Sequence, residues 1–351
     1  MKISPILSIL VITHNQRDLL KRCLQSVLAQ ELHVPFEVIV SDDRSTDGTE
    51  EWITAYQQEI INRQKNGELP NLVELRYVHC NSDECDPKDV SERCGWNKLT
   101  VYEAARGEYF VNIDADDYLR SSDVYQIQLD MLMAHPECSM CMQDVWQVQN
   151  GVDESTGFRW PTYGKVENGH VFTVKDIIGD YRALNQCYMT RRHPEDNMRQ
   201  LYGKYFDDTI ITQHHLQYGP VVFVDRADYV WVQYRTSITK TLTGDDSLLE
   251  YAFLQLHHVK MIPQFKNEFM EAGLHDMIHF FKVLTNKHFK LELTDRTLAG
   301  YKEQKGYIYR VFTKKSLTIL DKIRLSYIRL LCLMYKKFGW KNFDFLYKNL
   351  V

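Results

Sequence analysis

Alternation of apolar, strand-length runs with helix-length stretches is the feature that most constrains the fold of this chain. The runs lie at residues 7–12, 36–40, 72–78 and 109–113, and a helical stretch follows each of them. A run that is apolar at nearly every position is typical of a strand buried on both faces, as in parallel sheets. The alternation therefore predicts an α/β fold with a Rossmann-like, mostly parallel sheet flanked by helices. Ligands of such sheets bind beyond the carboxyl ends of the strands.

Capping residues mark where two of these helices are expected to begin. Asn15 is expected to cap a helix that ends near residue 29. Ser121 or Ser122 is expected to cap a helix that ends near residue 134.

The pattern changes in the second half of the chain. Residues 140–148 alternate between apolar and polar, which predicts a strand with one exposed face. Residues 220–224 and 229–234 are typical of two further strands, and the chain turns helical beyond Thr243. We therefore predict a first domain at residues 1–242 and a helical C-terminal region at residues 243–351.

Composition limits the classes of function. The formal net charge is −5, so a general nucleic-acid binder, which is normally basic, is not expected. The eight cysteines are scattered, and most fit reduced thiols better than a zinc site. No uncharged apolar stretch reaches about 18 residues, and the N-terminal run is too short for a signal peptide. We therefore expect a cytoplasmic protein.

Two acidic groups directly follow two of the predicted strands. They comprise Asp42, Asp43 and Asp47 in the first group and Asp114, Asp116 and Asp117 in the second. Crowded carboxylates repel one another and are costly to desolvate, so such a cluster needs a cation or hydrogen-bond donors to compensate it. Carboxylate oxygens suit Mg²⁺ or Mn²⁺, which take further ligands from substrate phosphates. The first group lies where hydrogen bonds could recognise the base and ribose of a nucleotide.

These acidic residues also have simpler interpretations. Residues 43–48 imitate the start of an EF-hand calcium loop, but the twelfth position, which needs a bidentate Glu, is Thr54. Asp47-Gly48 is also typical of a plain turn, and residues 114–117 could form a solvated turn without a metal.

Several motifs occur in one order along the first half of the chain. Thr13-His14-Asn15 follows the first strand, and residues 42–49 read Asp-Asp-Arg-Ser-Thr-Asp-Gly-Thr after the second. Asn97 lies on a predicted helix, and Ala105-Arg106-Gly107-Glu108-Tyr109 then leads to Asp114-Ala115-Asp116-Asp117. In this order and spacing the motifs resemble those of the inverting family-two glycosyltransferases of the GT-A fold. The resemblance covers roughly residues 5–240 and is strongest in the first half.

The resemblance implies a set of donor-binding and metal-binding residues. A nucleotide sugar, with a UDP-sugar favoured, would bind to Thr13, Asn15, Asp42, Asp43, Asn97, Asp114, Ala115 and Asp116. The metal, Mn²⁺ or Mg²⁺, would bind to Asp114, Asp116 and Asp117.

A weaker match in the second half implies the catalytic base. Tyr205-Phe206-Asp207-Asp208 precedes a predicted helix and matches an acidic pair of the family. The resemblance implies Asp208 as the general base and Asp207 as its supporting neighbour. The family more often has Glu at the first of these positions. Many members also carry a histidine soon after a Tyr-Arg pair, where this chain has Tyr234-Arg235 and then Thr236.

The implied function is metal-dependent, inverting transfer of a sugar to a hydroxyl of a glycan or lipid-linked acceptor, in bacterial surface-polysaccharide synthesis. One alternative is a sugar-phosphate nucleotidyltransferase, but that class should have a Gly-rich loop where this chain has Thr13-His14-Asn15. A second alternative is a catalytically inactive nucleotide-sugar-binding protein, which the intact aspartates disfavour. A dinucleotide oxidoreductase should show GxGxxG after the first strand, and this chain does not.

Other polar residues near the predicted base allow two readings. Arg191, Arg192 and His193 either face the acceptor or diphosphate or form a solvated loop. His214 and His215 fall on the helix that follows Asp208 and are expected to be structural.

The C-terminal end, residues 314–351, is basic and amphipathic. It holds nine Lys or Arg against two Asp, interleaved with Leu, Ile and Tyr. Such a helix can lie in a membrane interface, which would place the protein peripherally on the inner face of the cell membrane. Alternatively, it packs on its own catalytic domain or on a second subunit in a homodimer.

Overall fold

The computed structural model describes two compact units, Met1–Arg235 and Thr236–Val351. The residues that it describes are 3–80, 90–149, 154–160, 166–178, 188–193, 195–196, 198–201, 208–234, 255, 258–259, 261–284, 319, 323, 326 and 330.

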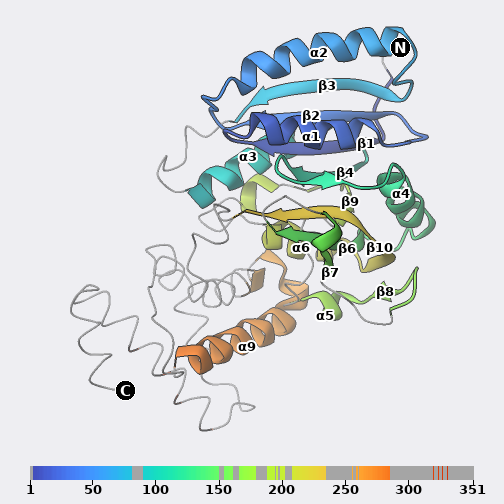
Figure 1. The fold of residues 1–351 in the computed structure, drawn as a ribbon. Coiled ribbons are helices and arrows are strands. Elements are labelled where there is room, and N and C mark those ends of the chain that lie inside the picture. The colour runs from blue at the N-terminus through green and yellow to red at the C-terminus, as the bar shows by residue number, and fades with distance from the viewer. Residues whose placement is uncertain are drawn as a thin grey trace. The chain divides into compact units, whose positions relative to one another are not determined.

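The first half of the first unit alternates strand and helix as the sequence predicts (Figure 1). Its elements are β1 (Leu7–Thr13), α1 (Arg17–Leu28), β2 (Phe36–Asp42), α2 (Thr49–Lys65), β3 (Leu72–His79), α3 (Val90–Ala104) and β4 (Tyr109–Asp114). β1 and β2 are buried along almost their whole length, because helices cover both faces of the sheet.

The second half of this unit is more irregular. Its strands and helices are β5 (Tyr118–Leu119), α4 (Val124–Ala134), β6 (Met140–Gln149), β7 (Phe158–Trp160), β8 (Val171–Phe172), α5 (Val174–Ile177), β9 (Tyr188–Arg191), α6 (Asp208–His215) and β10 (Val221–Gln233). The described stretches between them also hold short 3₁₀ turns, η1 (Glu154–Thr156), η3 (Met198–Leu201) and η4 (Leu216–Tyr218).

One sheet joins these strands in the order β3-β2-β1-β4-β9-β6-β10-β5. β1 pairs in parallel with β2 and β4, β2 with β3, and β6 with β10. β9 runs antiparallel to both of its neighbours, β4 and β6, so the long strands on either side of it point the same way. The prediction of a mostly parallel sheet flanked by helices is confirmed, with β9 and the short strands β5, β7 and β8 running against the common direction.

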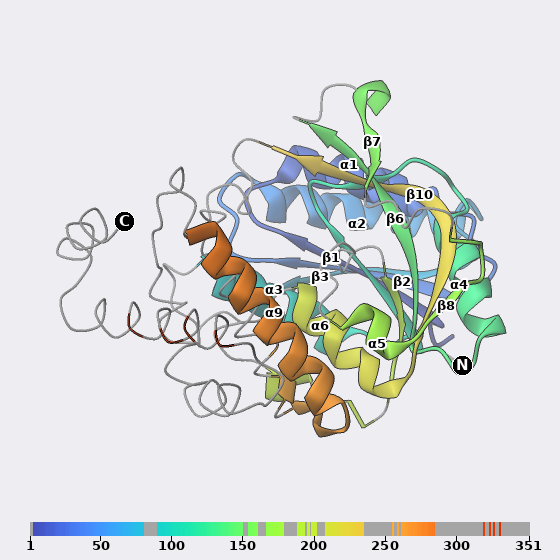
Figure 2. The same ribbon diagram turned by 90° about the horizontal axis from the view of Figure 1, so that it is seen from below.

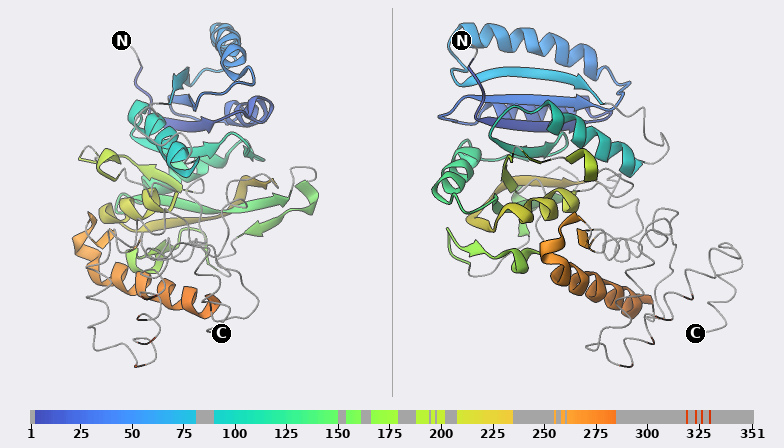
Figure 3. Two further views of the ribbon diagram at one scale, coloured as in Figure 1. Left: turned by 90° about the vertical axis from the view of Figure 1, so that its left-hand side faces the viewer. Right: turned by 180° about the vertical axis from the view of Figure 1, so that it is seen from behind.

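Helices cover both faces of the sheet in the first unit. Viewed along the strands, α1 and α2 lie on one face and α3 lies on the other (Figure 3). This division follows from right-handed crossovers, because the chain reverses its direction across the sheet between β3 and β4. α5 and α6 lie on the same side as α3 (Figure 2).

Two predicted helix caps are wrong. The residue before α1 is Gln16, whereas Asn15 adopts a left-handed conformation with φ 52°. The Asn15 side chain is used elsewhere, because its Oδ1 accepts a hydrogen bond from the Thr46 amide at 2.7 Å. α4 is preceded by Asp123 rather than by either predicted serine.

Two predictions about the later strands are also wrong. β6 is buried on both faces, because its polar side chains have partners inside the protein. Gln143, for example, accepts a hydrogen bond from the Asp228 amide at 3.2 Å. The two strands expected at 220–224 and 229–234 form the single strand β10, whose register against β6 shifts between Val224 and Tyr229.

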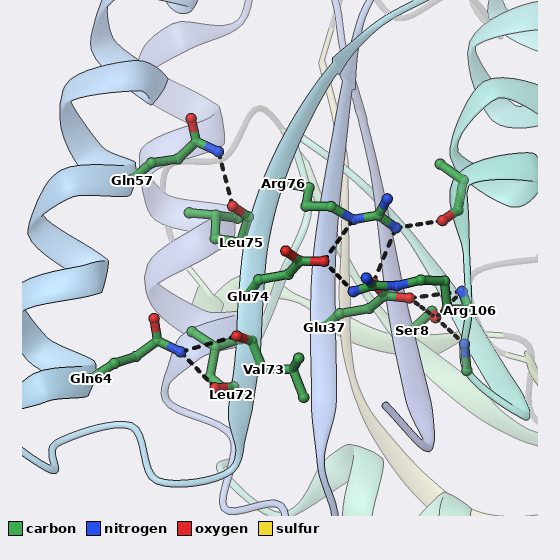
Figure 4. A network of polar contacts seen from close by, with 12 residues as sticks. Ser8, Glu37, Gln57, Gln64, Leu72, Val73, Glu74, Leu75, Arg76 and Arg106 are labelled. Carbon is green, nitrogen blue, oxygen red and sulfur yellow. Dashed lines mark hydrogen bonds and ion pairs between the residues drawn. The ribbon is translucent and has the colours of Figure 1, made fainter. Parts of the chain in front are cut away.

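A buried ionic network holds the amino ends of the strands together (Figure 4). Glu37 of β2 is fully buried, and its Oε1 accepts hydrogen bonds from Ser8 Oγ at 2.7 Å and from the Arg106 amide at 2.8 Å. Its Oε2 accepts from Arg76 Nη2 at 3.0 Å and from Arg106 Nε at 2.9 Å. Burial alone would raise the pKa of Glu37, but the hydrogen bonds from Ser8 and Arg106 outweigh it and lower the pKa.

The described part of the second unit is helical. A short 3₁₀ turn, η5 (Pro263–Phe265), leads into α9 (Lys266–Leu284). Ile319, Ile323, Ser326 and Leu330 are also helical. Across the parts of the chain that the structure describes, no helix is both long and apolar enough to cross a membrane.

Candidate functional site

The two acidic groups lie at the same edge of the sheet. β1 is the strand between β2 and β4, and all three run in parallel. Thr13 at the end of β1 is in register with Asp42, and Ile12 is in register with Asp114. The carboxyl ends of the three strands therefore bring both groups together, one on each side of β1.

Asp42 organises the loop that follows β2. It is 2% exposed, and its Oδ1 accepts hydrogen bonds from the Ser45 amide at 3.2 Å and from Ser45 Oγ at 2.5 Å. Its Oδ2 accepts from the Tyr77 hydroxyl at 2.8 Å. Burial and this hydrogen bond raise the pKa of Tyr77. Both oxygens of Asp42 thus hold the shape of the loop.

Asp47 and Gly48 form a turn that also begins α2. Asp47 Oδ1 accepts hydrogen bonds from Thr49 Oγ1 at 2.6 Å and from the Thr49 amide at 3.2 Å, and Oδ2 accepts from the Arg17 amide at 2.9 Å. Burial would raise the pKa of Asp47, but these hydrogen bonds lower it. Gly48 has φ 82°, a left-handed conformation that favours glycine. Asp47 therefore fixes the starts of both α1 and α2.

Asp43 faces a cationic partner from α3. Its Oδ2 accepts from Arg93 Nε at 2.8 Å and lies 2.6 Å from Arg93 Nη2. The Asp43 amide donates to the Thr13 carbonyl oxygen at 3.1 Å, and its own carbonyl oxygen lies 2.6 Å from Nδ1 of His14. Arg93 and His14 are polar residues of this edge that motif reasoning did not select.

Asn97 and Thr13 each have a buried polar atom at this edge that lacks a hydrogen-bond partner among the residues that the structure describes. Asn97 is 3% exposed, and its Nδ2 donates to the Thr13 carbonyl oxygen at 3.1 Å. Its Oδ1 and the Oγ1 of Thr13 make no hydrogen bond with any other described residue. A buried polar atom left without a partner costs about 1–3 kcal/mol, so such atoms are suited to receive a ligand.

The second acidic group forms a tight turn after β4. The Asp117 amide donates to the Asp114 carbonyl oxygen at 3.0 Å, and the fully buried Ala115 donates its amide to the Ile12 carbonyl oxygen at 3.1 Å. Carboxylate oxygens of the three aspartates all lie within 4.8 Å of one another. Burial and the charge of Asp114 raise the pKa of Asp116 to about 7.

Asp117 differs from its two neighbours because β10 binds it. Its fully buried carboxylate accepts a hydrogen bond from the Tyr229 hydroxyl at 2.5 Å and one from the Val232 amide at 2.8 Å. Burial and the charges of Asp116 and Asp114 raise its pKa well above the usual value. Arg22 of α1 completes the turn, because its Nη2 donates to the Asp116 carbonyl oxygen at 2.5 Å.

Histidine, glutamate and cysteine make a second group with metal-ligand chemistry. Within the described residues, His135, Glu137 and Cys138 also place possible ligand atoms within 4.8 Å of one another. Burial and the charge of Glu137 raise the pKa of Cys138 to about 11, which keeps its thiol protonated at neutral pH. The aspartate turn is therefore the better match to a hard cation.

α6 begins at Asp208, so the predicted base stands at the amino end of a helix. The Asp208 side chain and the whole of Asp207 lie outside the described residues. Arg191 is engaged inside the protein, because its Nη1 donates to the Tyr109 hydroxyl at 2.8 Å. His193 stacks on Tyr218 with a ring-centroid distance of 3.9 Å.

The amino-acid sequence of this chain is similar to a family model and to several known proteins. Residues 8–73 match the family model described as Glycosyl transferase family 2. An uncharacterized protein of Mycobacterium bovis is 31% identical over 140 residues, which is 40% of this chain and 35% of that relative. TuaG of Bacillus subtilis, whose name assigns it to teichuronic acid biosynthesis as a glycosyltransferase, is 26% identical over 129 residues, 37% of this chain and 42% of TuaG. The chain thus spans about a third to two fifths of the length of these relatives.

Solved structures match over almost the whole chain. The crystal structure of S. aureus TarS 1-349 superposes with a TM-score of 0.59 and 16% identity, covering 98% of this chain and 90% of that one. Its complex with UDP-GlcNAc gives a TM-score of 0.60 at the same identity. At this level of identity the likeness shows the fold alone.

Proposed function

We propose that this chain, which carries a family-two glycosyltransferase segment on a GT-A fold, transfers a sugar from a nucleotide sugar to an acceptor hydroxyl. The observation that supports this most directly is the meeting of two acidic groups at neighbouring strand ends, one on each side of Thr13. One group is built into a hydrogen-bonded loop, and the other concentrates negative charge. A nucleoside diphosphate with its metal needs both features side by side.

The nucleoside of the donor would bind at the first group. Asn97 Oδ1 and Thr13 Oγ1 are buried and lack partners in the described part of the chain, so they suit the polar groups of a base or ribose. Arg93 and Asp43 form an ion pair at the same edge, which adds a cation and an anion that a bound nucleotide could engage. UDP is the nucleotide we favour, because the TarS structures of similar fold were solved with UDP and with UDP-GlcNAc.

A divalent cation fits the second group. Asp114 and Asp116 supply hard oxygen ligands, and the raised pKa of Asp116 reflects its burial and the nearby charge of Asp114, which a cation would compensate. Asp117 already accepts two hydrogen bonds from β10, so we assign it chiefly to holding the turn in place. When bound, Mn²⁺ or Mg²⁺ supplies Lewis-acid stabilisation of the charge that develops on the diphosphate.

Asp208 would serve as the general base. In the proposed reaction, the acceptor hydroxyl gives its proton to the Asp208 carboxylate while its oxygen bonds to the anomeric carbon. The bond from that carbon to the diphosphate oxygen breaks on the opposite face, so the anomeric configuration inverts. A well-placed base contributes on the order of 10²–10⁴-fold to the rate. Asp207 would support it as the neighbouring carboxylate.

The test is nucleotide release from a panel of UDP-, GDP- and dTDP-sugars, with Mn²⁺ or with EDTA. We expect one donor class to be turned over with metal only, and Asp116→Asn to abolish metal-dependent release. Asp130→Asn is the matched control, because it makes the same change on an exposed position of α4 and should leave release unchanged. Turnover in EDTA at the full rate would contradict the metal assignment.

Asp208→Asn separates the base from donor binding. This variant should bind UDP and Mn²⁺ like the unaltered protein but lose transfer. Wild-type turnover by Asp208→Asn would overturn the base assignment. Tight UDP binding without turnover of any donor by the unaltered protein would instead identify a nucleotide-sugar-binding protein.

For the C-terminal segment we propose association with an anionic membrane surface. Ile319, Ile323 and Leu330 are 80%, 59% and 52% exposed, and their spacing places them on one face of a helix. The surrounding sequence is rich in Lys and Arg, which attract anionic headgroups. An acceptor carried on a lipid would then meet the enzyme at the membrane.

A further inference from the structure

A buried aspartate outside the motifs lies at the junction of three elements. Asp196 follows β9, and its side chain is only 1% exposed. Its carboxylate accepts a hydrogen bond from the Tyr102 hydroxyl and lies 2.5 Å from His214 Nε2. His215 Nε2 lies 3.1 Å from its other oxygen.

The environment keeps this carboxylate charged. Burial alone would raise the pKa of Asp196, but the hydrogen bond from His214 and the close approach of His215 outweigh burial and hold the pKa far below its usual range. A charged group this deeply buried is costly unless its donors stay in place. The geometry of the surrounding side chains is therefore tightly coupled to Asp196.

The donors come from the two helices that the proposed reaction needs. Tyr102 is on α3, which also carries Arg93 and Asn97 of the nucleotide edge. His214 and His215 form the last turn of α6, whose first residue is Asp208. One carboxylate thus bridges the helix that faces the donor and the helix that begins at the proposed base.

Ring packing connects the same cluster to β4. The His215 ring meets Phe110 edge-on at 5.6 Å between centroids and lies 6.5 Å from Tyr102. Phe110 belongs to the strand that ends at Asp114. On its other side, Nδ1 of His215 lies 2.8 Å from the Ile211 carbonyl oxygen one turn earlier in α6. His215 is therefore held from both sides, and α6 is fixed against β4 and α3 together.

We propose that Asp196 is a positioning residue that sets the place of Asp208 relative to the donor site, an inference that rests on the proposed function. Asp208 lies seven residues before His215, about 10 Å along the helix axis. Over that distance, a small tilt of α6 at the two histidines moves Asp208 by an appreciable fraction of an ångström. Misplacement of a reacting group by about 1 Å can cost on the order of 10²-fold in rate.

The experiment replaces Asp196 with Asn, which keeps the shape and removes the charge. With the donor selected by the panel, we expect kcat of Asp196→Asn to fall by about 10- to 100-fold while the donor KM changes by less than about twofold. Binding of UDP with Mn²⁺, measured by calorimetry, should also be unchanged. A variant that is only less stable would have an unchanged kcat when it is assayed well below its melting temperature.

Glu37→Gln is the matched control. It makes the corresponding change in another buried ionic cluster, which lies at the amino ends of the strands, away from the proposed donor site, and it should lower stability without lowering kcat. A second test is the pair Asp196→Asn and His215→Gln, because two amides can hydrogen-bond without a counter-charge. We expect the double variant to be no slower than Asp196→Asn alone, whereas independent effects would multiply.

A measurement that does not depend on turnover tests the positioning role of Asp196 independently of the proposed sugar transfer. Hydrogen exchange of peptides that cover α6 should rise in Asp196→Asn, while exchange of α2 should stay as it is. Faster exchange in α6 with unchanged kcat would overturn the positioning role. Unchanged exchange in α6 would overturn it even if no donor were ever turned over. Failure of the unaltered protein to turn over any donor would count against the proposed function only.

Discussion

Replacing Glu37 by Gln tests how much the buried network at the amino ends of the strands stabilises the fold. Gln keeps the volume and one oxygen of Glu. Its NH₂ group, however, cannot accept hydrogen bonds and must lie against groups that donate them. If the oxygen takes the place of Oε1, which accepts from Ser8 and the Arg106 amide, the new NH₂ group faces Arg76 and Arg106. The charge-assisted hydrogen bonds of Oε2 are then lost.

The expected cost follows from burial. Removing one partner of a buried ion pair costs about 3–5 kcal/mol. The side chains of Arg76 and Arg106 are 27% and 42% exposed and also contact Glu74, so water and Glu74 take up part of their charge. We therefore expect the lower end of that range, about 3 kcal/mol, or roughly 6–12 °C in the melting temperature of a unit of this size.

Urea unfolding of the full chain, followed by circular dichroism at several pH values, measures this difference. The folded-state pKa of Glu37 is lowered, so its contribution is present above the unfolded pKa and is lost as pH falls through the folded pKa. The difference in free energy of unfolding between the unaltered protein and Glu37→Gln should stay constant from pH 8 to 6 and shrink below about pH 4.3. Equal stability at neutral pH, or a gap that persists in acid, would refute the reasoning.

Three further changes test other features. Tyr229→Phe removes the hydroxyl that donates to buried Asp117, so we expect a loss of about 1.5–3 kcal/mol in urea melts with EDTA, and an unchanged midpoint would contradict it. Gly107→Ala would place a Cβ 2.7 Å from a backbone nitrogen and should destabilise by about 1–3 kcal/mol in the same assay, whereas wild-type stability would show that the strand can shift. Ile323→Glu combined with Leu330→Glu should reduce co-sedimentation of the full chain with anionic vesicles relative to neutral ones, and equal partitioning would remove the membrane proposal.

Local pattern was enough to predict the first half of the fold. A strand that is apolar on both faces, followed by an amphipathic helix, repeats often enough to specify parallel βαβ units. That topology places Asp42 and Asp114 at one edge. The turn at Asp47-Gly48 was also readable, because a left-handed glycine turn is decided by neighbours in the chain.

Contacts between distant residues were not readable in the same way. Asp117 is bound by Tyr229, and Asp43 by Arg93, and no periodicity relates residues so far apart. The helix cap predicted at Asn15 was wrong for a related reason. Its side chain accepts a hydrogen bond from the Thr46 amide in another loop and does not cap the helix that follows it. The polar residues of β6 suggested solvent only because their partners inside the protein could not be seen in the sequence.

The attachment of Asp117 to β10 has a consequence for how the protein matures during synthesis. The ribosome releases β1 to β4 first, and these strands can assemble from near neighbours. The turn at residues 114–117, however, receives its hydrogen bonds from Tyr229 and Val232, which are synthesised more than a hundred residues later. A nascent or truncated chain that stops before β10 would hold three like charges without their anchor. The three aspartates would thus reach the arrangement seen in the folded protein only when β10 has been added to the sheet.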